Sequence, residues 1–346
     1  MGLGPGEHEV RKLQATGGST FTLSLPKPWV VEQKLEPRDS LRVDWRPSGA
    51  LRITPLNETS TRELHAFFDH NRLPENSLHD HLMGAYISGA DVIKVSFQEV
   101  NQAQLARSVR RFLKSTRGFE IVSEGVGTME LRCLLNAGDM PLHASLNRMY
   151  LMVTSLMRDV VTVFEGGDIE FLADAEEREA EVDALLYLIE RQTRLLLDSH
   201  TVATKLNLSR SQALEYANLA KSLERMMDHT NNLTKFMLAN PNLVKSTKAF
   251  VPMEHVPVWM GALKELMINI RTRDSERIEL ARHELKSTQQ TLLAYERDLL
   301  TSGTKAQALA QGLKVSESIR RLCAYSRDFG EVLLNMKIST EMSVVR

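Results

Sequence analysis

The stretch 219-LAKSLERMMDHTNNLTKFM-237 decides the fold. Its buried-type positions recur at alternating spacings of four and three residues, which indicates one face of a helix packed in a bundle; they are Leu219, Leu223, Met226, Thr230, Leu233 and Met237. Glu224 and Asp228 lie one helical turn apart in the same stretch, so both carboxylates share a face. The stretch therefore predicts a bundle helix that carries an acidic pair.

Helical periodicity continues on both sides of this stretch, from about Pro141 to the end of the chain. It divides into two trios of helices, residues 141–240 and 241–346, and Asn240-Pro241-Asn242 separates them. The breaks within the trios are predicted at Gly166-Gly167, Asn207 to Ser209, Arg273-Asp274 and Ser302-Gly303. Each trio has a short first helix followed by two long ones, so we interpret it as an internal repeat.

The residues before the bundle form two further segments. In residues 1–58 apolar and polar residues alternate, as at Ser19 to Leu25 and Leu41 to Trp45, which predicts short strands around a helical turn that begins near Pro28. So small a unit buries little core alone, and we expect it to pair with a second copy. Residues 59–140 read as a small α/β connector, with helices at 82–88 and 102–114 and strands at 90–97, 118–122 and 129–134.

Composition and charge narrow the functional class. The 346 residues carry 43 basic and 44 acidic side chains, and the net charge of −1 excludes a histone-like basic coat without excluding a local DNA-binding face. Cys133 and Cys323 are too few for a disulfide framework or a zinc site. With no signal peptide and no long apolar run, we expect a cytoplasmic protein that does not span a membrane.

A second acidic pair, Glu179 and Asp183, has the same spacing on the preceding helix, with Glu176 one turn before it and Asn232 one turn after Asp228. Oxygen donors from two neighbouring helices suit a divalent or trivalent cation, and like charges repel unless a cation or proton neutralises them. The same spacing is also typical of a solvated helix face. No Glu-x-x-His pair, nucleophile elbow or P-loop is present, so we expect no enzyme.

Basic residues in the first segment suggest a second kind of site. Arg11, Lys12 and Lys27 flank the first predicted strands and would form a DNA-facing patch at one end of a dimer. Through Thr59, however, eight basic residues stand against seven acidic ones, so charge alone favours a solvated surface.

Two motifs resemble a known family. The run 16-TGGSTFTLSLPK-27, followed by Trp29-Val30, resembles the amino-terminal SpoVT/AbrB-type domain of archaeal PhoU-family proteins. The helical part resembles PhoU itself, whose Glu-Arg-x-x-Asp metal motif matches Glu224 to Asp228, with Glu179 to Asp183 on the partner helix. The resemblance implies a mainly α fold: two tandem three-helix repeats form a six-helix bundle, preceded by the α/β connector and a swapped-hairpin β-barrel.

The resemblance also implies a function. It points to a metal-binding regulator of phosphate uptake that holds Fe, Zn, Mg or Mn at Glu179, Asp183, Glu224 and Asp228. The expected partners are a second copy of the chain, joined through the amino-terminal domain, DNA, and a phosphate transporter or phosphate-signalling protein. Two alternatives stay open: an AbrB-type transcription factor whose helical domain senses a ligand, and an adaptor without metal that docks on a phosphate transporter or kinase.

The chain departs from the family pattern at two places. In the second repeat Arg320 and Ala324 stand where the motif has Glu and Asp, and the partner helix has Glu284 with Thr288, which predicts a degraded second metal site. In the first segment Arg38 stands where the AbrB pattern has Gly, in a turn that often needs a positive φ angle.

Overall fold

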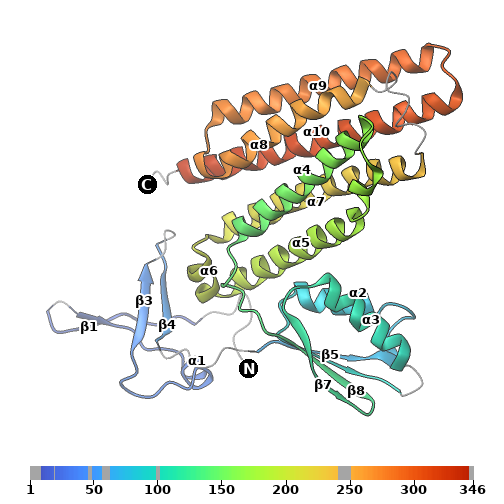
Figure 1. The fold of residues 1–346 in the computed structure, drawn as a ribbon. Coiled ribbons are helices and arrows are strands. Elements are labelled where there is room, and N and C mark those ends of the chain that lie inside the picture. Colours follow the sequence, from blue (N-terminus) through green and yellow to red (C-terminus); the bar gives the residue numbers. More distant parts are fainter. Residues whose placement is uncertain are drawn as a thin grey trace. The chain divides into compact units, whose positions relative to one another are not determined.

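The computed structural model describes residues 9–18, 20–45, 49–56, 63–98, 102–240 and 251–342. The chain divides into two compact units, Met1–Glu63 and Leu64–Arg346, which are treated separately below. The second unit contains both the α/β connector and the helical bundle (Figure 1). The finer division into four segments stays a prediction.

The N-terminal unit consists of two hairpins and one short helix. Strands β1 (Gln14–Thr16) and β2 (Thr20–Thr22) pair antiparallel, as do β3 (Leu41–Trp45) and β4 (Leu51–Pro55). Helix α1 (Lys27–Glu32) has a proline in its first turn, as expected. Strands β1 and β2 are shorter than predicted, and Arg38 adopts the positive φ, 84°, that the turn was expected to need.

None of the described residues of this unit is buried. Large apolar side chains of both hairpins face solvent: Phe21 is 66% exposed, Val43 58% and Trp45 86%. The two hairpins form separate two-stranded sheets in a single chain, so the β-barrel stays a prediction that needs a partner to complete it. A unit of this kind lacks the apolar burial that offsets the entropy of folding.

The α/β module begins the second unit and has a four-stranded sheet in the order β5-β6-β8-β7. Its elements are β5 (His65–Asp69), η1 (His70–Arg72), α2 (Leu78–Ile87), β6 (Val92–Ser96), α3 (Gln102–Ser115), β7 (Phe119–Gly125) and β8 (Thr128–Cys133). Strand β5 pairs parallel with β6 and was not predicted. The core under α2 and α3 includes Tyr86, Ile93, Leu105, Phe112 and Leu131, all fully buried.

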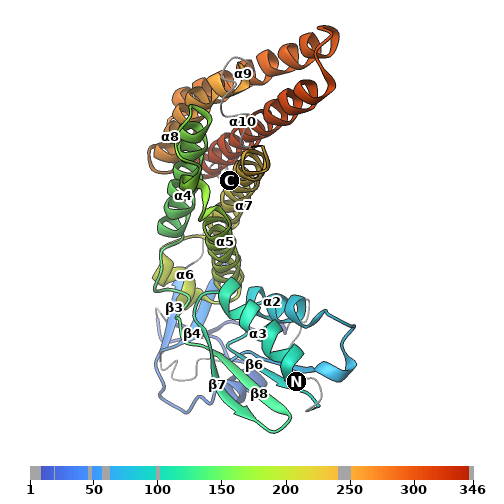
Figure 2. The ribbon, with the colours of Figure 1, turned by 45° about the vertical axis from the view of Figure 1, so that its right-hand side comes forward.

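The bundle contains long helices arranged as two trios, as predicted (Figures 1 and 2). The short first helix predicted for the first trio is wrong, because α4 has 23 residues and α5 has 24. The first has α4 (Leu142–Phe164), η3 (Ile169–Leu172), α5 (Ala175–Asp198), the unpredicted α6 (His200–Leu206) and α7 (Arg210–Ala239); the second has η5 (Val251–His255), α8 (Val256–Thr272), α9 (Ser275–Thr301) and α10 (Ala306–Glu341). Positive φ angles at Gly166, Asn207, Arg273 and Gly303 end helices at the predicted breaks. No helix among the described residues is apolar and long enough to cross a membrane.

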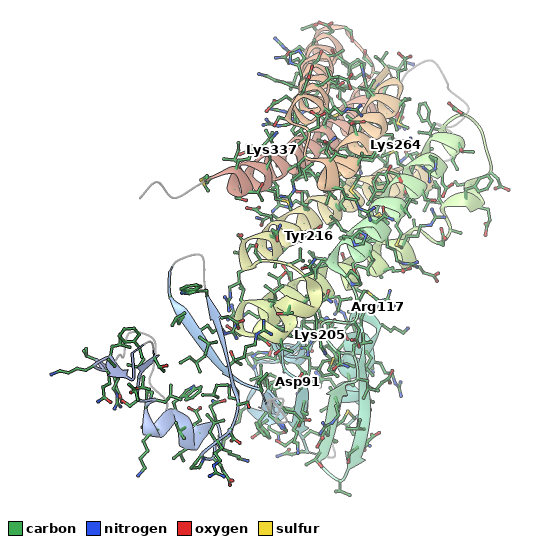
Figure 3. All side chains as sticks on the ribbon, turned by 90° about the vertical axis from the view of Figure 1, so that its left-hand side faces the viewer. Asp91, Arg117, Lys205, Tyr216, Lys264 and Lys337 are labelled. Carbon is green, nitrogen blue, oxygen red and sulfur yellow. The ribbon has the colours of Figure 1, made fainter. Side chains whose placement is uncertain are left out.

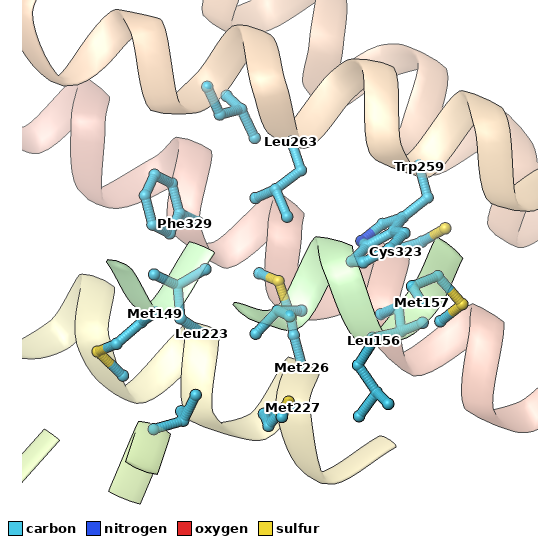
Figure 4. Packing of buried hydrophobic residues seen from close by; sticks show 14 of the residues in the cluster. Met149, Leu156, Met157, Leu223, Met226, Met227, Trp259, Leu263, Cys323 and Phe329 are labelled. Atoms are coloured by element: carbon cyan, nitrogen blue, oxygen red, sulfur yellow. The ribbon is translucent and has the colours of Figure 1, made fainter. Parts of the chain in front are cut away.

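One continuous core joins the two trios. Met226 and Leu223 of α7 belong to the same buried cluster as Trp259 of α8 and Phe329 of α10 (Figure 4). The Trp259 Nε1–H group donates to Ser326 Oγ at 2.9 Å, and that hydroxyl lies 3.5 Å from Met226 Sδ. The indole nitrogen is therefore satisfied inside the core, and the two repeats pack as a single bundle.

The α/β module is anchored to α5 by a buried arginine. Arg191 is 3% exposed, and its Nη1 donates to the Tyr86 carbonyl oxygen at 2.8 Å. Its guanidinium lies over the Tyr86 and Phe119 rings, at 5.2 and 5.6 Å from their centroids, and 3.4 Å from Asp91, which Figure 3 labels. Cation–π contacts and a charged hydrogen bond thus join the module to the bundle.

Candidate functional site

The predicted acidic residues lie along two neighbouring helices. Glu179 and Asp183 belong to α5, Glu224 and Asp228 belong to α7, and the two helices pack side by side (Figure 1). All four carboxylates are half-buried, because the adjoining apolar residues of both helices are buried in the interhelical core. We call these four residues the acidic face.

Burial and mutual repulsion disfavour ionisation on the acidic face. Burial, together with the charges of Asp228 and Glu179, raises the pKa of Asp183 to about 6. Burial, together with the charges of Asp228 and Asp183, raises the pKa of Glu224 to about 7. The carboxylates of the two helices therefore act on one another electrostatically, and a cation placed among them would relieve both effects.

The electrostatic effects also reach Asp228 and the neighbouring Tyr187. Burial raises the pKa of Asp228, while His229, Lys235 and Arg225 act in the opposite direction. Tyr187, one turn after Asp183 on α5, packs against the core of the α/β module. Burial and the nearby carboxylates, Asp183 first, raise the pKa of this tyrosine. The acidic face therefore lies close to the junction between bundle and module.

Glu179 has two partners on α7, Asn231 and Lys235. Its Oε2 accepts a short hydrogen bond from the Asn231 side-chain amide and lies 3.6 Å from Lys235 Nζ. Asn231 is 1% exposed, and its Oδ1 has no hydrogen-bond partner in the described structure. Asn232, which was predicted to extend the acidic stripe, is exposed, whereas Asn231 is buried beside Glu179.

The oxygen atoms of these residues suit a hard cation, but they are not arranged as a complete coordination site. Within the ranges described, no three His, Cys, Asp or Glu side chains are gathered closely enough to hold a metal ion. The chemistry nevertheless fits: four carboxylates line one face, and the buried Asn231 Oδ1 is an additional oxygen donor without a partner. Cation binding at these residues would require the carboxylates to move closer together.

In the second repeat, Arg320 and Arg327 of α10 lie in the region that corresponds to the acidic face. Arg320 Nε lies 3.2 Å from Glu296, and Arg327 donates to Gln289 Oε1 at 2.8 Å, so the seam between α9 and α10 carries its own positive charges. Thr288 is buried, and Tyr325 faces the first repeat, with its ring 5.7 Å from that of His229. The degraded second metal site stays a prediction.

The predicted DNA-binding residues all belong to the N-terminal unit. Arg11 and Lys12 precede β1, Lys27 begins α1, and all three are exposed. Arg11 forms an ion pair with Glu9, which neutralises part of its charge. A DNA face built from these three residues stays a prediction.

Comparison with known proteins identifies one domain. Residues 146–237 match the model of the PhoU domain family. The match covers most of α4, then α5 and α6, and most of α7, and therefore includes the whole acidic face. The similarity supports a role in the regulation of phosphate homeostasis. No curated protein and no solved structure matches the chain.

Proposed function

We propose that this protein is a non-catalytic, metal-binding regulator of phosphate uptake. The observation that carries the proposal is the acidic face itself, where burial and neighbouring carboxylates raise the pKa values of Asp183 and Glu224 within the segment similar to PhoU. Asp183, Glu224 and Asp228 would hold the cation, and Glu179, oriented by its hydrogen bond from Asn231, would join them. A bound Fe, Zn, Mg or Mn ion would supply positive charge that offsets the repulsion between the carboxylates of α5 and α7.

Metal analysis tests this proposal. The full chain is stripped with chelator, dialysed against Fe, Zn, Mn and Mg in turn, and analysed by mass spectrometry beside Glu224→Gln/Asp228→Asn. We expect the wild-type chain to retain metal and the variant to lose most of it, because each substitution removes a charged oxygen donor. As a matched control, Glu276→Gln/Asp298→Asn removes two exposed carboxylates from α9 and leaves the metal content unchanged.

Phosphate uptake gives an independent measurement. In cells whose own copy of the gene carries Glu224→Gln/Asp228→Asn, we expect uptake to persist when external phosphate is high, whereas the α9 control represses it normally. Equal metal content in wild type and variant would contradict metal binding. Normal repression in both would contradict the regulatory role and leave an adaptor that works without metal.

We also infer that two copies of the chain associate through the N-terminal unit and present Arg11, Lys12 and Lys27 to DNA. Large exposed apolar residues of this unit, among them Phe21, Val43 and Trp45, support association, since a partner hairpin would cover them. Gel shifts on DNA upstream of phosphate-transport genes, in a salt series, test the DNA contact. Arg11→Ala/Lys12→Ala should weaken binding and flatten the salt dependence, and no shift at low salt would exclude it.

A further inference from the structure

Helix α3 of the α/β module carries a line of unbalanced positive charge. Its exposed charged residues are Arg107, Arg110, Arg111 and Lys114, and the helix contains no acidic residue. Arg110, Arg111 and Lys114 follow Arg107 by three, four and seven residues, which places all four on one side of the helix. The chain as a whole is almost neutral, so this basic stripe is a local concentration of charge.

Among the residues that the structure describes, no neighbour neutralises the basic stripe. None of its four residues forms an ion pair with a carboxylate anywhere in the described ranges, whereas Arg117, just beyond the helix, pairs with Glu181 at 3.5 Å. His79 lies on the adjoining helix α2. Burial and the positive charge of Arg111 on α3 together lower the pKa of this histidine. The positive charge of the stripe is therefore available to bind an anionic ligand.

The rest of α3 limits the kind of ligand. Its apolar side is used up by the module core, since Leu105, Val109 and Phe112 are fully buried, so the helix has no apolar face to insert into a lipid surface. No exposed large apolar or aromatic side chain lies on it. It therefore lacks both the apolar centre of a protein interface and the stacking platform that single-stranded nucleic acid needs.

We propose that the basic stripe binds the sugar–phosphate backbone of duplex DNA without reading its sequence. The stripe spans about 10 Å along the helix, and each DNA strand presents a phosphate about every 3.4 Å of its axis. Three of the four cations are arginines, whose planar guanidinium groups bind phosphate oxygens in pairs. This contact is separate from the N-terminal residues proposed above and does not depend on them.

Fluorescence anisotropy with the full chain and a short random-sequence DNA duplex tests the stripe. For Arg107→Ala/Arg110→Ala/Arg111→Ala/Lys114→Ala we expect a tenfold or greater loss of affinity. We also expect the slope of log K against log salt to fall by about 3, because each lost phosphate contact removes nearly one unit. A second variant with lysine at all three arginines keeps the charge and most of the slope, and circular dichroism confirms that each variant is folded.

Control variants distinguish this contact from DNA binding elsewhere on the molecule. Arg158→Ala/Arg194→Ala/Lys286→Ala/Arg297→Ala removes the same number of exposed cations from other helices and should bind DNA like the wild type. Arg11→Ala/Lys12→Ala tests the N-terminal face alone, so either contact can fail while the other stands. Unchanged affinity and slope in the α3 variant, equal loss in the matched control, or stripe-dependent binding to phosphatidylglycerol vesicles or duplex RNA instead of duplex DNA would overturn the proposal.

Discussion

At the scale of single residues, the acidic face makes stability depend on pH in an unusual direction. The pKa values of Asp183 and Glu224, about 6 and about 7, lie above those of the unfolded chain. Ionisation is therefore less favourable in the folded state. The stabilising contribution is complete below about pH 4 and is lost as the pH rises through the folded pKa values.

We expect the unfolding free energy of the chelator-treated protein to fall by about 1 kcal/mol between pH 5 and pH 8, a figure reduced for partial exposure. Asp183→Asn and Glu224→Gln should each remove part of this dependence, because the amide does not ionise. Urea denaturation across the pH range measures it. Identical pH profiles for wild type and both variants would show that these carboxyls are not perturbed.

Asn231 allows a second prediction at this scale. Its amide holds Glu179, and its Oδ1 is buried without a partner. Asn231→Ala should weaken metal binding about tenfold or more, as loss of a residue that orients a ligand typically does. Metal titration by calorimetry measures the change, with the exposed neighbour substitution Asn232→Ala as control. Equal affinity in both variants would remove Asn231 from the site.

The buried asparagine beside Glu179 is position 231, whereas the sequence pattern singled out position 232. At 3.6 residues per turn these positions lie about 60° and about 40° around the helix from Asp228, so spacing alone does not choose between them. The four carboxylates were identified from spacing and family resemblance, but the hydrogen bond to Glu179 depends on how two helices pack, which one helix's pattern does not contain.

At the scale of elements, Arg191 is the attachment of α5 to the α/β module. Arg191→Ala removes a buried charged hydrogen bond and two cation–π contacts, so we expect the unfolding free energy to fall by about 2–4 kcal/mol. Thermal and urea unfolding measure the change. Arg194→Ala, an exposed position on the same helix, should change stability by less than about 0.5 kcal/mol. Similar effects of the two variants would mean that the junction contributes little.

The helical elements were more predictable than the sheet. Breaks at Gly166, Asn207, Arg273 and Gly303 are local signals, and the helices end there. Strand β5 has no such signal, because His65 to Asp69 does not alternate cleanly and pairs in parallel with a strand more than twenty residues later. Helix α6 is a single short segment in what reads as a linker between longer helices, so periodicity does not detect it.

At the scale of the whole molecule, the exposed apolar residues of the N-terminal unit predict self-association. Phe21→Asp should convert a dimer into a monomer, because it places a charge on a surface that a second copy would bury. Thr20→Asp, the adjacent position on the opposite face of strand β2, should leave the dimer intact. Sedimentation velocity on the full chain measures the mass, and a wild-type monomer at micromolar concentration would contradict the prediction.

The buried tryptophan gives the molecule an optical property. Trp45 is 86% exposed and Trp29 is half-buried, both in the N-terminal unit, whereas Trp259 is fully buried in the bundle. Trp259 is therefore shielded from a water-soluble quencher, whereas the quencher reaches Trp45 in a chain kept monomeric, for example by Phe21→Asp. Through Ser326 this indole contacts Met226, which stands between Glu224 and Asp228 on α7. Its fluorescence reports shifts of the helix that carries the acidic face, with no added label.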